Sequence, residues 1–181
     1  MQFLDISARL ELKTVALESV VGITSNVEQF PVETWQKIFP LLIKIAYEDK
    51  SEPLKKDAAL ALINLSANQE IAKGMLNHGD HSKRLVNILW KMIVECAYPS
   101  ADPACMILCN LTIEKVCCDK VYHFLKGNGI TMKDVVDQLC VEENSDEKKP
   151  KLHYLGESFN VIFQTVKSPY SSVYVCCHSI S

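Results

Sequence analysis

The chain has 181 residues, of which 48% are hydrophobic and 23% are charged, as in a soluble globular protein. No run of about eighteen apolar residues occurs, which argues against a membrane-spanning helix. The formal net charge is −3, whereas a phosphate-binding surface normally shows an excess of basic residues. We therefore expect neither nucleic acid nor a membrane as a partner.

The N-terminus carries no recognisable export signal. Asp5 and Arg9 fall where a signal peptide would have its apolar centre. Without export, the eight cysteines are expected to be reduced thiols, and a disulfide framework is the less favoured alternative. These features favour a cytosolic or nuclear location.

The N-terminal third of the chain predicts two helical regions. Residues 3–26 have the pattern of one long helix, or of a short helix followed by a longer one. Gly22 inside this region costs about 1 kcal/mol relative to alanine, so we expect a bend or a close helix contact there. The apolar run at 31–46 contains Pro40, which lacks a backbone donor and is expected to kink the helix or split it in two.

Further helices follow at intervals along the rest of the chain. Residues 142–151 are densely charged and contain a proline, which predicts a mobile loop. Residues 168–181 fit no helical stripe and are expected to form an irregular tail. The remaining helices are expected at 54–67, 70–76, 82–98, 101–112, 121–125, 132–141 and 152–166.

Three of the predicted helices are copies of one repeat. The segments 13–24, 55–66 and 101–112 align without gaps, with apolar residues at i, i+3, i+4 and i+7 that only Ser19 interrupts. The copies are 42 residues apart (Gly22 to Asn64) and then 46 (Asn64 to Asn110), the spacing of armadillo and HEAT units. The sequence therefore predicts an all-α fold, an armadillo/HEAT-like α-solenoid of about three to four repeats, over residues 1–167.

Asn64 and Asn110 occupy the same position in two of the copies. A side-chain amide on the inner helix of a solenoid can hydrogen-bond both edges of an extended peptide backbone. The alternative is that each amide ties down a loop of the neighbouring repeat, since half-buried amides are usually satisfied locally, and both interpretations stay open. The candidate partner-binding residues are these two and the polar residues on the same helix flanks: Asp57, Asn64, Asn68, Asn110 and Glu114.

Cysteines in and after the third copy provide donors for a soft metal. Cys105 and Cys109 are four residues apart on one helix face, but the paired short knuckles of a structural zinc site are missing. In the repeat alignment Cys105 matches Leu17 and Ala59, and Cys109 matches Val21 and Ile63, so we interpret both cysteines as core atoms. The residues that follow them and could add donors are Cys117, Cys118 and His123.

No pattern in the chain fixes a base beside a nucleophile, and no glycine-rich phosphate loop is present. We therefore expect no catalytic residue, no metal ligand and no cofactor. A cysteine-based hydrolase is the least favoured function.

Four segments occur in an order that resembles the HGH protein family, also called brain protein 16-like: ARLELKTVALESVVGIT, KKDAALALINLSAN, ADPACMILCNLT and LHYLG. The likeness covers roughly residues 3–156, and the block at 101–112 is its most specific part. The resemblance implies a non-catalytic armadillo-type adaptor of the cytoplasm. We expect the chain to be a monomer. It also implies the partners, because this family binds newly made elongation factor 2 and delivers it to the cytosolic chaperonin.

The chain departs from the family after residue 156. The family continues into another helical region, whereas here ESFNVIFQTV and then the irregular tail follow. We therefore expect a truncated or alternatively spliced product, or a mispredicted gene model.

The rival functions are a generic armadillo protein-binding scaffold and an importin-like carrier of basic peptides. Carrier grooves pair each asparagine with a tryptophan one turn earlier. Here Leu60 precedes Asn64 and Met106 precedes Asn110, so the aliphatic stems of a basic peptide would lack aromatic slots.

Overall fold

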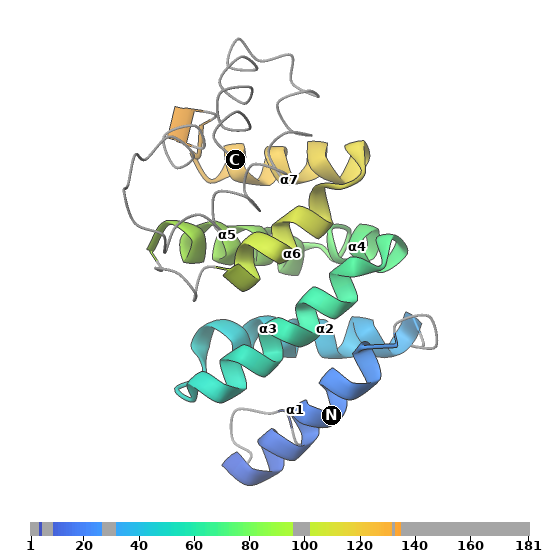
Figure 1. The fold of residues 1–181 in the computed structure, drawn as a ribbon. Coiled ribbons are helices and arrows are strands. Elements are labelled where there is room, and N and C mark those ends of the chain that lie inside the picture. The colour runs from blue at the N-terminus through green and yellow to red at the C-terminus, as the bar shows by residue number, and fades with distance from the viewer. Residues whose placement is uncertain (1–3, 5–8, 27–31, 96–101, 132, 135–181) are drawn as a thin grey trace, which may run out of the picture. The chain divides into compact units, whose positions relative to one another are not determined.

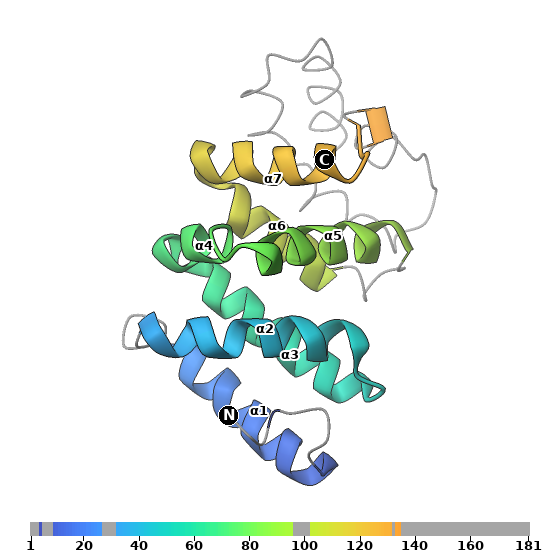
Figure 2. The same cartoon turned by 180° about the vertical axis from the view of Figure 1, so that it is seen from behind.

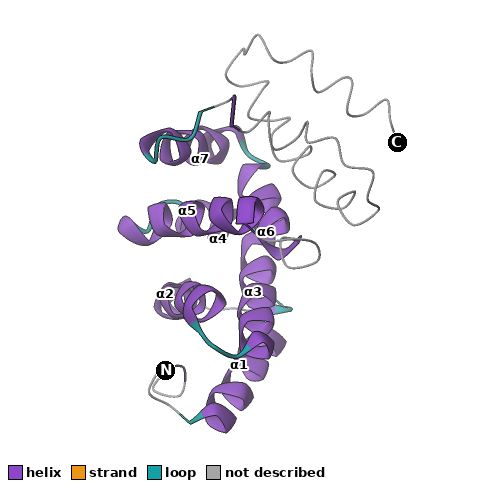
Figure 3. Cartoon of the chain, turned by 90° about the vertical axis from the view of Figure 1, so that its left-hand side faces the viewer, coloured by secondary structure: helices purple, strands orange, loops and turns teal. Residues whose placement is uncertain are grey.

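The computed structural model describes residues 4, 9–26, 32–95, 102–131 and 133–134, and every regular element in α1 to α7 is helical (Figure 3). The chain divides into two compact units, Met1–His81 and Ser82–Ser181, and each is described by itself. None of the described helices is long and apolar enough to cross a membrane. The predicted loop at 142–151, the helix at 152–166 and the tail at 168–181 lie outside the described residues.

In the described part of the first unit, three helices pack around α3. Helix α3 contacts α1, α2 and α4, and α2 also contacts α4 (Figures 1 and 2). Helices α1 and α3 lie side by side and run in the same direction, as copies of a stacked repeat should (Figure 1). The bounds are α1 (Leu10–Thr24), α2 (Val32–Glu48), α3 (Glu52–Ala67) and α4 (Gln69–Met75).

Small residues allow this close packing of α3. Ala58 and Ala61 are fully buried on one side of the helix, next to the larger buried side chain of Leu65. The predicted span of α3 was 54–67, and the observed helix begins two residues earlier, with Pro53 in its first turn. Periodicity was therefore a good guide to this element.

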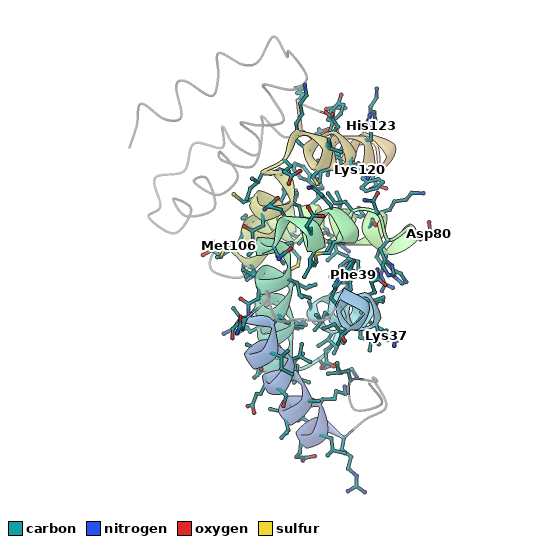
Figure 4. The ribbon with its side chains drawn as sticks, turned by 90° about the vertical axis from the view of Figure 1, so that its right-hand side faces the viewer. Lys37, Phe39, Asp80, Met106, Lys120 and His123 are labelled. Atoms are coloured by element: carbon teal, nitrogen blue, oxygen red, sulfur yellow. The ribbon has the colours of Figure 1, made fainter. Side chains whose placement is uncertain are left out.

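Helix α2 runs through Pro40 without a break. Of the two outcomes expected for Pro40, a kink or a split, the split is therefore wrong. The neighbouring Phe39, Leu42 and Ile43 are buried, and their packing holds the helix together across the missing backbone hydrogen bond. Lys37, on the opposite side of α2 from Phe39, is exposed (Figure 4).

The close helix contact involves Gly74 rather than Gly22. No described atom lies within 4 Å of the position that a Cβ of Gly22 would take, and this residue is exposed in α1. At Gly74, in α4, a Cβ would lie 2.5 Å from Cζ2 of Trp35 in α2. The expected close contact at Gly22 is thus wrong, because that part of α1 faces outwards.

A largely buried ion pair joins α1 to the turn after α2. Nζ of Lys13 lies 3.0 Å from Oδ2 of Asp49, and both side chains are 9% exposed. The other carboxylate oxygen of Asp49 accepts a 3.0 Å hydrogen bond from the backbone N–H of Ser51. The carboxylate is therefore satisfied at both oxygens, as a buried charge needs to be.

The second unit contains α6 (Asp102–Thr112) in contact with α7 (Lys115–Gly127), and most of α5 (Asp80–Glu95). Helix α5 overlaps the predicted helix at 82–98, and its Leu85, Leu89 and Ile93 are buried on one side. Helix α7 begins six residues before the predicted span of 121–125. Its first residues, Lys115 to Cys118, show no clear apolar stripe in the sequence, so the sequence pattern did not indicate this first turn.

The repeat register is visible in the burial of equivalent residues. Leu17, Ala59 and Cys105 are all buried, whereas Val21, Ile63 and Cys109 are all half-buried. The interpretation of these cysteines as core atoms is confirmed for Cys105, whereas Cys109 is only half-buried. Ile23 departs from the register, since it is 55% exposed while its equivalents Leu65 and Leu111 are fully buried.

Candidate functional site

The first candidate residue, Asn64, makes its hydrogen bond to the neighbouring copy of the repeat. Its Nδ2 donates to Oγ1 of Thr24, at the end of α1, over 3.3 Å. Thr24 is fully buried, and its hydroxyl donates in turn to the backbone carbonyl of Val21 over 3.1 Å. The amide of Asn64 is half-buried, and its carbonyl oxygen accepts no hydrogen bond from the described residues.

This bond makes Asn64 a tie between α1 and α3. As far as the described residues go, one of its two N–H donors is used within the fold, while its oxygen and its other N–H are available to a partner. The structure therefore accommodates both interpretations of this amide, and its role in binding a peptide stays a prediction.

Asp57 lies two turns before Asn64 on the same flank of α3 and is also half-buried. It forms no ion pair or hydrogen bond with the described residues. Leu60, between these two positions in sequence, is 43% exposed. The structure thus brings together Asp57, Leu60 and Asn64 along one accessible side of α3.

Asn68 has a structural role at the junction of two helices. It is the C-cap residue of α3 and the N-cap residue of α4. Its Oδ1 accepts hydrogen bonds from the backbone N–H groups of Glu70 (3.0 Å) and Ile71 (3.1 Å). The oxygen that would bind a partner is therefore occupied by the helix terminus.

The other two candidates belong to the second unit. Asn110 is half-buried near the end of α6, and Glu114 is the half-buried N-cap residue of α7. The side chain of Glu114 does not cap α7. Met106 projects outwards from α6 one turn before Asn110, the place that Leu60 takes before Asn64 (Figure 4).

Sequence analysis missed a buried hydroxyl at the end of each repeated helix. Thr24, Ser66 and Thr112 are equivalent in the alignment, and each is at most 1% exposed. Each donates a hydrogen bond to the carbonyl three residues earlier, over 2.9 to 3.1 Å. The signal was present in the motifs GIT, NLS and NLT, whose last residue is always a hydroxyl.

The described cysteines do not assemble into a recognisable site. Cys105, Cys117 and Cys118 are buried, Cys109 is half-buried, and none of these four forms a disulfide. In the part of the chain that the structure describes, no group of three or more His, Cys, Asp or Glu side chains is placed to hold a metal ion.

Comparison with known proteins shows which proteins this chain is similar to. No protein-family model matches the chain. Curated proteins named Protein HGH1 homolog align with nearly all of it: those of Drosophila pseudoobscura pseudoobscura and Drosophila melanogaster are each 27% identical and cover 98% of the chain. The Danio rerio protein of the same name is 27% identical over 86% of the chain.

The chain is thus similar to members of the HGH family, which supports the resemblance seen in its sequence. It spans about half the length of the HGH relatives that it matches, namely 48%, 47% and 40% of the three proteins. The resemblance to this family that the four sequence segments indicate is thereby confirmed.

Among solved structures, the chain is similar to a designed armadillo repeat protein in complex with the peptide (KR)4. The TM-score is 0.64 at 19% identity, over 92% of this chain and 65% of the designed protein. This likeness concerns the fold alone. Together with the helical content of the described residues, it establishes the predicted α-solenoid of armadillo type.

Proposed function

We propose that the chain is a non-enzymatic adaptor of the cytoplasm that binds newly made elongation factor 2 and passes it to the cytosolic chaperonin. The observation that carries the proposal is the alignment with HGH1 homologues over 98% of the chain. The client and the chaperonin are those that the family resemblance implies.

The fold is suited to such a role. Stacked repeats present side chains from successive helices on a continuous surface, which can hold an incompletely folded client through many weak contacts. In the first unit, the accessible side of α3 provides an aliphatic side chain at Leu60, a carboxylate at Asp57 and a partly unused amide at Asn64. These groups can contact both the side chains and the backbone of a bound segment.

The direct test is retention of newly translated elongation factor 2. The tagged chain is added to a cell-free translation of elongation factor 2 and recovered on an affinity resin. We expect recovery of elongation factor 2 well above that of another newly translated protein of similar size, with chaperonin subunits in the same fraction.

The designed armadillo protein is the matched control, because it has the same fold and a different sequence. Equal recovery of elongation factor 2 on both solenoids would reduce the function to that of a general armadillo scaffold. Recovery of elongation factor 2 without chaperonin would separate client binding from delivery.

A further inference from the structure

Helix α1 exposes a stripe of apolar side chains to solvent. Leu12, Val15 and Ile23 are 47%, 62% and 55% exposed, and Ser19 between them is exposed as well. Their spacing of i, i+3, i+7 and i+11 places all four on one side of the helix. We call this stripe the α1 end face, defined by Leu12, Val15, Ser19 and Ile23. Single exposed apolar residues are ordinary, but a continuous stripe of them indicates an interaction surface.

The same stripe is buried in the other copies of the repeat. The equivalents in α3 of three of its members are at most 1% exposed: Leu54 for Leu12, Ala61 for Ser19 and Leu65 for Ile23. In α6 the equivalents of Ser19 and Ile23 are Ile107 and Leu111, which are also buried. The α1 end face is therefore the surface on which a neighbouring helix packs in the later copies.

The place of α1 explains why its stripe is exposed. Helix α1 lies at one end of the first unit and packs chiefly against α3 (Figure 1). The buried Leu17 and Thr24 mark another side of α1 from the stripe. A repeat at the end of a solenoid normally has a polar outer surface, because no further repeat covers it. In α1 this outer surface is apolar.

The α1 end face is suited to a helix rather than to an extended segment. None of its four side chains is charged, and the hydroxyl of Ser19 donates a 2.8 Å hydrogen bond to the backbone carbonyl of Val15. The face can thus be covered without leaving a donor unsatisfied. An extended segment would bring backbone N–H and C=O groups that this face cannot bond, whereas a helix bonds its own.

The face is complementary to itself. Val15 and Ile23 are each four residues from Ser19, one before it and one after it. In an antiparallel pair of α1 helices with a twofold axis at Ser19, Val15 of one copy is level with Ile23 of the other, and the converse holds. The small Ser19 would face its own copy, where the helices approach most closely. Such pairing of unlike positions, repeated by symmetry, is the pattern of a twofold interface.

We propose that two copies of the chain associate through the α1 end face, with their α1 helices packed antiparallel about Ser19. This inference goes beyond the adaptor role and does not depend on it. Helix α1 has 15 residues, fewer than the about 20 to 30 residues that each partner contributes to a standard interface. The association is therefore weak, and the expected monomer is the state of dilute solutions only.

The test is sedimentation equilibrium of the whole chain from about 1 to 500 µM, where a weak dimer should form with a dissociation constant of about 10 to 100 µM. Val15→Lys and Ile23→Lys should each raise this constant at least about tenfold, because each would bury an unpaired ammonium group. A tenfold increase in salt should not weaken the apolar contact. Circular dichroism checks that the variants are folded.

Val116→Lys is the matched control, because Val116 of α7 is as exposed as Val15 but lies outside the α1 end face. It should leave the dissociation constant unchanged. A chain that stays monomeric over the whole range, or equal weakening by Val116→Lys, overturns the inference.

The antiparallel register is tested with Ser19→Cys and diamide as the oxidant. The proposed axis brings the two new thiols together, so a disulfide-linked dimer should form faster than in the wild type, whose own cysteines give the background. Glu11→Cys is the control, because this exposed residue lies eight positions from the axis and its two copies would be far apart. Equally fast cross-linking of both variants contradicts the proposed pairing.

Discussion

Gly74 lies directly against the indole ring of Trp35, so that an added Cβ would be 2.5 Å from Cζ2 and 2.7 Å from Cη2. The ring is buried and lies edge-on to Phe39 and His78, which leaves it little room to move. We therefore expect Gly74→Ala to lower the free energy of unfolding by about 1 to 3 kcal/mol, the usual cost of overpacking. Urea denaturation followed by circular dichroism measures this change.

Gly22→Ala provides the control for this prediction. Gly22 is also inside a helix, but no described atom lies within 4 Å of its added Cβ. Alanine there should raise the free energy of unfolding by about 0.5 to 1 kcal/mol, because it restricts the unfolded chain and favours the helix. If both variants changed stability in the same direction, the contact with Trp35 would not be the cause.

Removing one charge of the ion pair between Lys13 and Asp49 should lower the free energy of unfolding substantially. Asp49→Asn leaves the ammonium of Lys13 largely buried without its counter-charge. We expect a loss of about 3 kcal/mol in the free energy of unfolding. The double variant Lys13→Met with Asp49→Asn should lose less than the sum of the single variants, and a strictly additive cycle would argue against a direct coupling.

The contribution of the same ion pair to the stability of the fold should depend on pH. Burial alone would raise the pKa of Asp49, but the backbone N–H of Ser51 and the ammonium of Lys13 outweigh it and lower the pKa below its ordinary value of 3.8. A carboxyl with a lowered folded pKa adds stability above its unfolded pKa, and this is lost as pH falls through the folded pKa. The wild type should therefore lose its advantage over Asp49→Asn below pH of about 4. Unfolding curves of both proteins across this range test the prediction.

Repeat periodicity predicted the solenoid but not the contacts between its helices. Local spacing correctly predicts that Ala58 in α3 and Ala104 in α6 are buried, because each lies on the apolar stripe of its helix. In α1 it fails, because Ile23 on the predicted stripe is 55% exposed. Lys13 and Asp49 are 36 residues apart, and no local pattern indicates that they meet. The same holds for Gly74 and Trp35, whose contact depends on how α4 crosses α2.

The candidate site was also predicted only in part. Its residues were chosen by helix flank, which correctly placed Asp57 and Asn64 together on an accessible side of α3. Flank position does not reveal what a side chain bonds. Asn68 was chosen in the same way, and it caps α4 because the chain turns at that residue.

The two roles of Asn64 can be separated with Thr24→Val. Both Thr24→Val and Asn64→Ala remove the same hydrogen bond and are expected to cost about 1 kcal/mol of stability. Only Asn64→Ala also removes the amide from the accessible side. If the amide binds the client, recovery of elongation factor 2 falls for Asn64→Ala and stays at the wild-type level for Thr24→Val.

The double variant Asn64→Ala with Asn110→Ala extends this comparison to the second unit. We expect it to weaken recovery of elongation factor 2 while the helical circular dichroism spectrum is kept. Recovery equal to that of the wild type would assign both amides to the fold alone.

The cap that Asn68 forms on α4 should stabilise the fold. Asn68→Ala removes the acceptor for the N–H groups of Glu70 and Ile71 and should cost about 1 kcal/mol. Asn68→Asp keeps the acceptor and should be close to the wild type. Thermal unfolding of the two variants measures the difference, and equal losses would mean that something other than capping is disturbed.

The position of Asn68 also bears on how the first unit responds to force. Asn68 is the single residue between α3 and α4. With so short a connection, one helix cannot turn or slide far without moving the other. A pull on α3 from a bound client would pass directly into α4, and from Gly74 into the ring of Trp35 on α2. The first unit should therefore behave mechanically as one stiff lever rather than as a series of hinged helices.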